Sequence, residues 1–295
     1  MHDDTQRAFA LVGPGRAGTT IALALRARGW RCTGVAGRAV DSPNVLAVAE
    51  RLGAPPCEIG EVARDADVVI VATPDAVIAN AAAAVAPGLR TGALVLHLSG
   101  ACTLAELDKL RLERPDVEVG SLHPLQSFPS PEVGVTRLPG SWCAVDGPTD
   151  VERIAVSLGL RPFRIDDAQR AAYHATATVA SNHLVALMGQ VSRLAEAAGV
   201  PPAALLPLVR STLDNVEASG PATALTGPIR RGDVDTVARH LEALPADEQR
   251  AYRALAVEAL RLTGRDDPAL RELLEEPTPE PVPETVPEAV PEAVR

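Results

Sequence analysis

Aromatic side chains are scarce in this sequence. The 295 residues include only three Phe, two Tyr and two Trp, although 46% of the chain is hydrophobic. A core must therefore be built mainly from Ala, Val and Leu, and the length is enough for about two domains of ordinary size.

Positive charge is also in deficit. The chain carries 28 Lys and Arg against 38 Asp and Glu, which gives a formal net charge of -10. This balance opposes binding to nucleic acid or to an anionic membrane through an overall positive field. We therefore expect neither of these partners.

Cysteine pairs and long apolar runs are missing as well. Cys32, Cys57, Cys102 and Cys143 are far apart and match neither the spacing of metal ligands nor that of redox pairs. We expect buried free thiols and no metal. The first residues are polar, and no apolar run reaches the ~20 residues needed to span a bilayer, so we expect a soluble cytoplasmic protein.

A glycine motif stands between an apolar strand and a helix. The strand is expected over 9–12, the motif reads Gly13-x-Gly15-x-x-Gly18, and the helix is expected over 19–28. In a dinucleotide site the first glycine makes a tight turn, the second admits the pyrophosphate and the third lets the helix pack on the strand. The expected cofactor contacts are Gly13, Gly15, Arg16, Ala17 and Gly18.

Arg38 indicates which dinucleotide is bound. It lies about twenty residues after the last glycine, beyond a second strand expected over 31–35, where an NAD site carries Asp or Glu. A guanidinium there can pair with a 2′-phosphate. The alternative is an arginine on a solvated surface. We predict NADP(H) as the cofactor.

Strand-like and helix-like segments alternate through residue 165. Further strands are expected over 67–72, 93–98, 117–122, 142–145 and 162–165. This pattern predicts an α/β fold, a doubly wound Rossmann sheet whose strand ends meet at one crevice. Residues that follow strand ends are candidate contacts: Thr73, Pro74, Ser99 and Gly100 for the cofactor and Ser127 for the substrate.

Helical periodicity replaces the strand signals after this point. A long helix is expected over 168–198, and shorter helices over 203–218, 233–244 and 247–263. The predicted organisation is a Rossmann-like NADP-binding domain at 1–165, an all-helical substrate and dimerisation domain at 166–276, and a disordered Pro/Glu-rich tail at 277–295.

Polar side chains follow one face of the expected long helix. His174, Thr178, Ser181 and Asn182 stand at i, i+4, i+7 and i+8 in an Ala, Val and Leu background. His174 is a candidate proton donor, Asn182 a candidate catalytic hydrogen-bonding group and Ser181 a candidate substrate contact. A structural hydrogen bond from His174 is the alternative. His123, after a strand end, is a second candidate acid, or it fixes the loop that follows.

A second motif, residues 224–233, carries polar side chains between helix breaks. Thr226 and Arg231 can anchor a substrate carboxylate, because arginine offers a bidentate fork. A helix cap with a surface ion pair explains the same residues equally well.

Together these motifs resemble a known family. The stretches 13–18, 35–38, 96–100, 123–128 and 224–233 are similar to a bacterial Rossmann-like family with a C-terminal helical domain of unknown function. Its layout is similar to pyrroline-5-carboxylate reductase, ketopantoate reductase and the 6-phosphogluconate dehydrogenase group. The resemblance implies an NADP(H)-dependent oxidoreductase that forms a homodimer through its helical domain and reduces a small C=O or C=N group between its domains.

The same resemblance favours 2-dehydropantoate, a 2-oxo acid of the pantothenate pathway, as substrate, with a cyclic imine as the other choice. Many reductases of this layout use an interdomain lysine as proton donor, but the only lysine here, Lys109, lies on an expected exposed helix of the first domain. A histidine, a hydroxyl or water must then supply the proton. The missing lysine also admits a second hypothesis, an NADP(H)-binding sensor or scaffold without turnover.

Overall fold

The computed structural model describes residues 7–275, which fall into two compact units divided after Leu184. The predicted tail at 277–295 lies outside the described residues. Each unit is treated below by itself.

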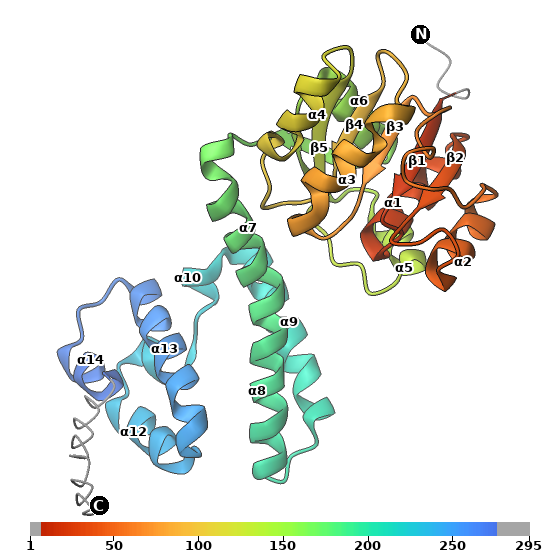
Figure 1. Cartoon of the computed structure of the whole chain (residues 1–295). Helices are drawn as coiled ribbons and strands as arrows, with labels where there is room; N and C mark the ends of the chain where they lie inside the picture. The colour runs from red at the N-terminus through yellow and green to blue at the C-terminus, as the bar shows by residue number, and fades with distance from the viewer. Residues whose placement is uncertain (1–6, 276–295) are drawn as a thin grey trace, which may run out of the picture. The chain divides into compact units, whose positions relative to one another are not determined.

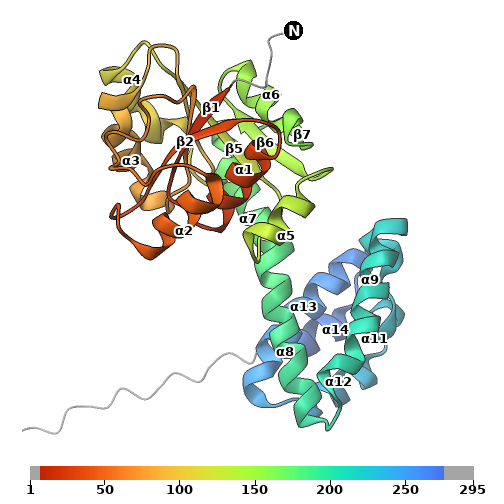
Figure 2. The same ribbon diagram turned by 90° about the vertical axis from the view of Figure 1, so that its right-hand side faces the viewer.

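The first unit is built on a sheet that has seven strands within residues 7–275 (Figures 1 and 2). The strands are β1 (Ala8–Val12), β2 (Arg31–Ala36), β3 (Val68–Val71), β4 (Leu94–His97), β5 (Glu118–Pro124), β6 (Trp142–Asp146) and β7 (Arg161–Arg164). Their order is β2-β1-β3-β4-β5-β6-β7. Neighbours are parallel except β5 and β6, which are antiparallel. The predicted doubly wound α/β sheet is confirmed.

Two apolar cores cover the two faces of this sheet. The helices are α1 (Arg16–Arg26), α2 (Pro43–Leu52), α3 (Ile78–Val85), α4 (Asp108–Glu113), α5 (Pro131–Arg137), α6 (Thr149–Ser157) and α7 (Arg170–Thr178). Alternate residues of β1 point to opposite faces, so Phe9 and Leu11 join one core with α1, α2 and α6, while Ala10 and Val12 join the other with α3 and α4. Both faces of the central strands are therefore buried, as their continuous apolar runs require.

The strand order reverses direction at β1. The chain leaves β1 to form β2 on one side and returns to form β3 on the other, so β1 lies between β2 and β3. In open α/β sheets the carboxyl ends of strands at such a reversal border a ligand crevice. The turn after β1 and the turn after β3 therefore define where a cofactor would lie.

The expected long helix is interrupted. Helix α7 passes into a π-helical segment, Val179–His183, before α8 (Leu184–Ala197) begins. A π-helical turn holds more residues than an α-helical turn, so side chains before and after it no longer share the face that a regular α-helix would give them. The sequence carries no simple signal for this interruption.

The last strand ends at Arg164, close to the boundary of 165 expected from the sequence, but the first compact unit continues to Leu184. The two positions differ because α7 packs on the sheet through side chains described below. The position where the strand pattern stops in the sequence thus marks a change of secondary structure. The boundary between the two compact units comes later in the chain.

The second unit is helical throughout its described residues, as predicted. It contains α8, α9 (Leu206–Ser219), α10 (Pro221–Ala224), α11 (Gly227–Arg231), α12 (Val234–Ala243), α13 (Ala246–Thr263) and α14 (Pro268–Leu274). Its core is formed by Ile229, Val237, Leu241, Ala256, Leu260, Leu270 and Leu274. Across residues 7–275, no helix combines the length and apolar character needed to cross a bilayer.

Candidate functional site

The turn after β1 requires glycine at two positions. Gly13 has a φ of 87°, and its amide donates to the Ala36 carbonyl at 2.9 Å. A Cβ on Gly13 would lie 2.8 Å from the backbone C and O of Ala72, and a Cβ on Gly18 would lie 2.6 Å from Cβ of Ala72. The first and third glycines of the motif thus have the roles expected from the sequence, a tight turn and close packing of helix on strand.

Helix α1 begins at this turn without a side-chain cap. Gly15 is the N-cap residue, and no acidic residue lies in the first turn. The first amides of a helix have no partner inside the helix, and here the residues that carry them are Arg16, Ala17 and Gly18. Open amides and the positive end of the helix dipole suit an anion such as a pyrophosphate.

Two cavities lie along the crevice between the ends of β1 and β3. The larger, of about 540 Å³, includes Gly13, Gly15, Arg38, Asn44, Thr73 and Pro74 in its lining. The smaller, of about 450 Å³, shares Gly15, Thr73 and Pro74 and adds Arg16, Ala17, Ser127 and Phe128. The two cavities adjoin at the residues that they share. Together they are lined by the predicted substrate contact Ser127 and by the predicted cofactor contacts of the glycine turn, Arg38 and the turn after β3, except Gly18, which lies in neither lining.

The Thr73 hydroxyl has no hydrogen-bond partner among the described residues, although its oxygen is buried. It lines both cavities. A buried hydroxyl without a partner is unfavourable, so a ligand group or water must satisfy it. In the lining of the larger cavity, Asn44 donates to the Pro14 carbonyl at 2.7 Å and fixes the glycine turn from the side of α2. The glycine turn, the open helix end and this hydroxyl all fit a dinucleotide.

Ser99 and Gly100 lie in neither cavity lining. The Ser99 hydroxyl accepts from the amides of Ala101 and Cys102 and so shapes the loop after β4. Gly100 packs flat against the ring of His123, because a Cβ at Gly100 would lie 2.6 Å from Cε1 of that ring. The expected contacts of Ser99 and Gly100 with the cofactor therefore stay predictions.

His123, Tyr173 and His174 form a cluster at the end of β5. Strand β5 extends to Pro124, so His123 lies inside the strand and not after it, as the sequence had suggested. Its Nδ1 is 2.6 Å from the Tyr173 hydroxyl, and its ring centroid is 6.0 Å from that of His174. The two predicted catalytic histidines are therefore brought together, and Tyr173 joins them.

Burial keeps the imidazole of His123 neutral. Burial, followed by the charges of His174 and Arg170, lowers the pKa of His123 to about 4. Burial also raises the pKa of Tyr173 well above its ordinary value. Two arrangements satisfy this contact: the tyrosine hydroxyl donates to Nδ1 when the imidazole proton is on Nε2, or it accepts from Nδ1–H when the proton is on Nδ1. The first arrangement is the one used in the proposal below. At neutral pH the ring of His123 is therefore neutral, so it can donate a hydrogen bond but is not in the imidazolium form that would transfer a proton.

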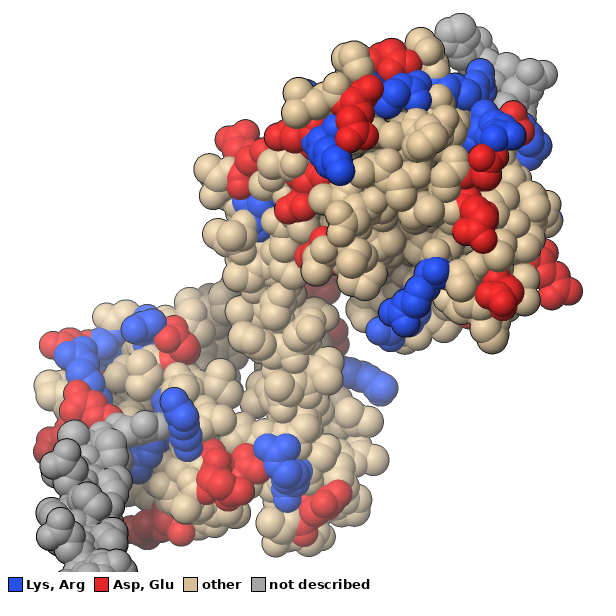
Figure 3. Space-filling model, in the orientation of Figure 1, with Lys and Arg blue, Asp and Glu red and all other residues tan. Residues whose placement is uncertain are grey.

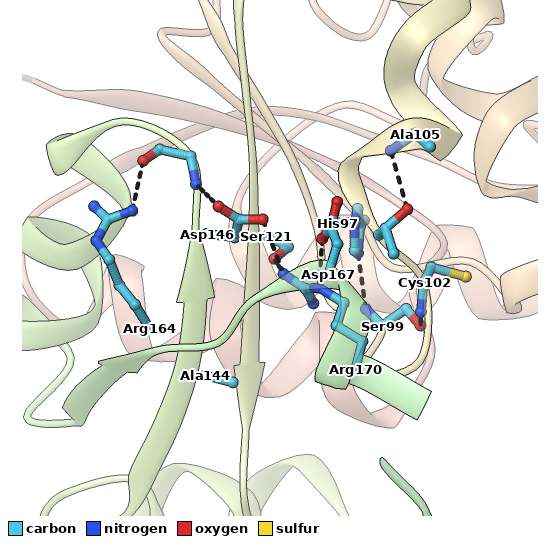
Figure 4. A network of polar contacts seen from close by, with 12 residues as sticks. His97, Ser99, Cys102, Ala105, Ser121, Ala144, Asp146, Arg164, Asp167 and Arg170 are labelled. Atoms are coloured by element: carbon cyan, nitrogen blue, oxygen red, sulfur yellow. Dashed lines mark hydrogen bonds and ion pairs between the residues drawn. The ribbon is translucent and has the colours of Figure 1, made fainter. Parts of the chain in front are cut away.

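A buried arginine, Arg170, lies one helical turn before Tyr173 and His174 on α7. Figure 4 shows its polar contacts with Ser121 and two aspartates. Arg170 donates through Nη2 to the Ser121 hydroxyl at 2.6 Å and lies close to Asp146 and Asp167, at 3.4 Å and 3.3 Å. Neighbouring His97 is fully buried, and burial and the Arg170 charge lower its pKa to about 4. Sequence reasoning missed Arg170 and Tyr173, although an Arg and a Tyr within an Ala-rich helix next to His174 could have drawn attention to them.

Two family models match the chain in sequence. Residues 3–116 match a Rossmann-like domain, and residues 145–259 match a domain of unknown function, DUF2520. The chain carries a Rossmann-like domain followed by a DUF2520 domain. This confirms the family resemblance expected from the motifs. His174 and Tyr173 lie within the DUF2520 match, and His123 lies between the two matches.

Solved structures show the same fold. A proposed NADP oxidoreductase from Bacteroides fragilis is 24% identical, with a TM-score of 0.73 over 89% of this chain and 100% of that chain. A Thermotoga maritima protein is 24% identical, with a TM-score of 0.65 over 91% of this chain and 100% of that one. A reductive aminase from Aspergillus terreus, in complex with NADPH and ethyl-5-oxohexanoate, is 16% identical, with a TM-score of 0.55 over 91% and 90% of the two chains. No curated protein sequence matches the chain.

The polar stripe expected after His174 is not continuous. Ser181 and Asn182 fall in the π-helical segment and are exposed, and the structure of residues 7–275 shows no hydrogen bond from either side chain. The regular spacing from His174 assumed an uninterrupted α-helix, so that spacing does not give the direction of these two side chains. Their expected contacts with substrate stay predictions.

The other motif of the DUF2520 domain carries ordinary local contacts. Thr226 is exposed at the start of α11 and makes no side-chain cap there. Arg231 is 64% exposed and lies 3.9 Å from Asp233, whose carboxylate caps α12 by accepting from the Thr236 amide. The ion pair weighed in the sequence is thus present for Arg231, whereas the helix cap in this motif is made by Asp233 and not by Thr226. A carboxylate contact through Thr226 or Arg231 stays a prediction.

Two further expectations concern lysine and metals. Lys109 lies on α4, 69% exposed and 4.0 Å from Glu113, as expected for a surface helix residue. No cluster of three or more His, Cys, Asp or Glu side chains suited to a metal occurs in the part of the chain that the structure describes.

Proposed function

We propose that the protein is an NADP(H)-dependent oxidoreductase that reduces a C=O or C=N group of a small molecule. The observation that supports this most is the placement of the crevice at β1 and β3 and of the His123 cluster along the same carboxyl edge of one sheet. The Bacteroides and Aspergillus proteins of similar fold carry NADP or NADPH in their descriptions, which agrees with the proposal.

The choice of NADP(H) over NAD(H) rests on Arg38. Its side chain is exposed in the lining of the larger cavity, after the end of β2. The lining includes no Asp or Glu. A ribose hydroxyl pair would lack its usual carboxylate partner, whereas a 2′-phosphate would meet a guanidinium without repulsion.

The direction of the cofactor follows from the same residue. If the adenosine half lies near Arg38 beside β2, the other half extends past the helix α1 amides toward the ends of β4 and β5. Adjacent strands are ~4.8 Å apart, so the end of β5 lies ~10 Å from that of β3. The nicotinamide end can then reach the side of the sheet on which His123 lies.

The protein's own residues then handle the proton. Bound NADPH supplies a hydride to the carbon of the reacting group. His123 offers its Nε2 proton as a hydrogen bond to the oxygen or nitrogen of that group, and Tyr173 holds its ring through Nδ1. His174, partly exposed beside it, is the residue we propose as proton donor. This division assigns His123 to polarisation and His174 to proton transfer.

For the substrate we propose a small 2-oxo acid, 2-dehydropantoate first, with a cyclic imine as the alternative. A carboxylate needs a cationic or hydroxyl anchor, and Ser127, Ser181, Asn182, Thr226 and Arg231 remain the proposed contacts. Arg231 holds its Asp233 partner only at 3.9 Å, so its fork is available to a better-placed carboxylate.

The direct test is binding and turnover. NADPH and NADH are titrated by fluorescence, and absorbance of NADPH is followed after addition of 2-dehydropantoate or pyrroline-5-carboxylate. In Arg38→Gln we expect NADPH affinity to fall by about 10-fold to 100-fold while NADH affinity stays the same, because one charge-assisted contact is lost. Arg90→Gln, which breaks only the surface pair with Asp67, serves as the matched control.

His174→Gln separates the reductase from a sensor or scaffold. We expect it to lose turnover by about 100-fold or more with NADPH affinity unchanged. NADPH binding without turnover on any carbonyl or imine, and equal behaviour of His174→Gln and wild type, would favour the scaffold. Failure to bind any dinucleotide would contradict the proposal at its first step.

We also propose that the DUF2520 domain forms a homodimer. Helix α9 buries none of its own residues, and exposed apolar side chains include Val185 at 71% and Leu208 at 62%. The stretch 171–192, which spans most of α7 and the start of α8, contains no Asp, Glu, Lys or Arg, and few charges are visible over these helices (Figure 3). Light scattering should give twice the 30.7 kDa chain mass, and Leu208→Glu should give the monomer.

A further inference from the structure

Arg170 is the largest fully buried side chain in residues 7–275, and the proposed reaction gives it no part. Its guanidinium is only 1% exposed, yet Nη1 has no hydrogen-bond partner among the described residues. Both carboxylates near it, those of Asp146 and Asp167, are partly exposed. A buried charge with an unpaired nitrogen is costly, so stability alone is a poor reason for an arginine at this position.

Two contacts join α7 to β5, and their spacings match. Ser121 and His123 are two residues apart on β5, so they face the same side of the sheet at ~6.6 Å separation. Arg170 and Tyr173 are three residues apart on α7, so they share a helix face at ~5 Å. The Arg170–Ser121 bond at 2.6 Å and the Tyr173–His123 bond at 2.6 Å therefore form two successive rungs between helix and strand.

We infer that Arg170 is a positioning residue for His123, which it holds in place through the rungs that join α7 to β5. The inference rests on the proposed function only in taking His123 as a group that faces the substrate. Arg170 fixes the rotation and the height of α7 on the strand. Tyr173 then meets Nδ1 of His123, and the ring is held between the tyrosine and Gly100.

The charge of Arg170 favours the same state of His123 as its hydrogen bond does, a neutral ring held by Tyr173. The groups that face His123 are Tyr173, His174 and Arg170 from α7, and Asp75 from the turn after β3, which acts in the opposite sense. A positive charge nearby disfavours the imidazolium and so keeps the ring neutral, which is the charge state that allows Nδ1 to accept a hydrogen bond from the tyrosine hydroxyl. Loss of Arg170 should therefore both loosen the second rung and make His123 easier to protonate.

The test uses the full-length protein, without cofactor, labelled with ¹⁵N at histidine. The pKa of His123 and the hydrogen-bond shift of its Nδ1 are measured by NMR in wild type, Arg170→Met, Arg170→Lys and Ser121→Ala. Arg153→Met is the matched control, because Arg153 also pairs with an aspartate, Asp150 at 2.8 Å, but on the surface.

In Arg170→Met we expect the pKa of His123 to rise, because the third contribution to its lowering, after burial and His174, is removed. The hydrogen-bond shift of Nδ1, called the Nδ1 signature below, should be lost. Ser121→Ala and Arg170→Lys keep the charge but lose the first rung, so the Nδ1 signature should weaken while the pKa stays low. Arg153→Met should change neither. Steady-state turnover of Ser121→Ala should fall by about 10-fold with KM nearly unchanged.

A folded Arg170→Met protein with the wild-type pKa and Nδ1 signature at His123 would overturn the inference. If Arg170→Met does not fold, Ser121→Ala and Arg170→Lys decide, and an intact Nδ1 signature in both would overturn it equally. The NMR readout needs no substrate. A wild-type protein without turnover would therefore contradict the proposed function and leave the positioning role of Arg170 to be judged on His123 alone.

Discussion

Replacing Gly13 by alanine tests the close approach of the glycine turn to β3, and Gly29 provides a matched control. Both glycines have a φ of 87°. A Cβ on Gly29 would meet no atom within 4 Å, whereas a Cβ on Gly13 would lie 2.8 Å from the Ala72 backbone and 2.9 Å from the Thr73 amide nitrogen. The two substitutions share the cost of a positive φ, and only Gly13→Ala adds a clash with backbone.

The magnitudes follow from these contacts. Alanine at a positive φ costs about 1–2 kcal/mol, which both variants lose. Overpacking against rigid backbone adds about 1–3 kcal/mol for Gly13→Ala alone. For a unit of this size we expect the melting temperature of Gly13→Ala to lie roughly 2–12 °C below that of Gly29→Ala.

The assay can report on the first unit alone. Both tryptophans of the chain, Trp30 and Trp142, lie in that unit, so tryptophan fluorescence follows its unfolding. NADPH titration of the two variants gives the second readout, with affinity expected to fall at least about tenfold in Gly13→Ala only, since the turn must move away from the phosphate position. Equal melting temperatures and equal NADPH affinities in the two variants would refute the reasoning.

Three other outcomes are expected. Gly100→Ala should displace the His123 ring, because a Cβ at this position would lie 2.6 Å from the ring, and turnover should fall by about 100-fold while NADPH affinity stays the same. Unchanged turnover would argue against a catalytic His123. Burial lowers the pKa of His97 to about 4, so between about pH 4 and 6.5 the folded state binds fewer protons than the unfolded state, and the free energy of unfolding falls as the pH drops through this range. In His97→Asn, denaturant titrations at several pH values should show this pH dependence reduced by about one proton, and a slope identical to that of wild type would count against it. Cys57 and Cys102 should react with a thiol reagent in the native protein before the buried Cys32 and Cys143, whose thiol pKa values burial raises to about 11 and about 12, and simultaneous labelling of all four would contradict the described core.

Local patterns were sufficient to predict the sheet and the cofactor turn. The apolar strand before Gly13, the glycine spacing and the run 67–72 each depend on neighbours in the chain, and β1, α1 and β3 form where these patterns place them. The strands expected at 142–145 and 162–165 are present as well. The antiparallel direction of β6 was not readable, because it depends on whether the connection 125–141 crosses to the opposite end of the sheet before β6 begins.

The candidate catalytic cluster was only partly predictable. His123 and His174 could be named because histidines near a strand end and on a polar helix stripe are unusual in this composition. Tyr173 and Arg170 depend on how α7 docks on β5, which no spacing within one segment encodes. The π-helical turn at 179–183 has no simple signal in the sequence either, and it departs from the regular spacing on which Ser181 and Asn182 were grouped with His174.

The reversed direction of β6 has a consequence for how this fold can diversify. Because β6 runs against β5, Pro124 and Cys143 are paired neighbours, and the loop between the strands both leaves and re-enters the sheet at the edge that carries His123. Helix α5 in this loop is fixed, because Leu138 at its end is fully buried in the core beside α1. The stretch 125–130 before α5 can change without moving a strand register, and it carries Ser127 and Phe128 of the crevice lining. Evolution or design can therefore rewrite this one stretch to admit molecules of another shape and leave the rest of the sheet untouched.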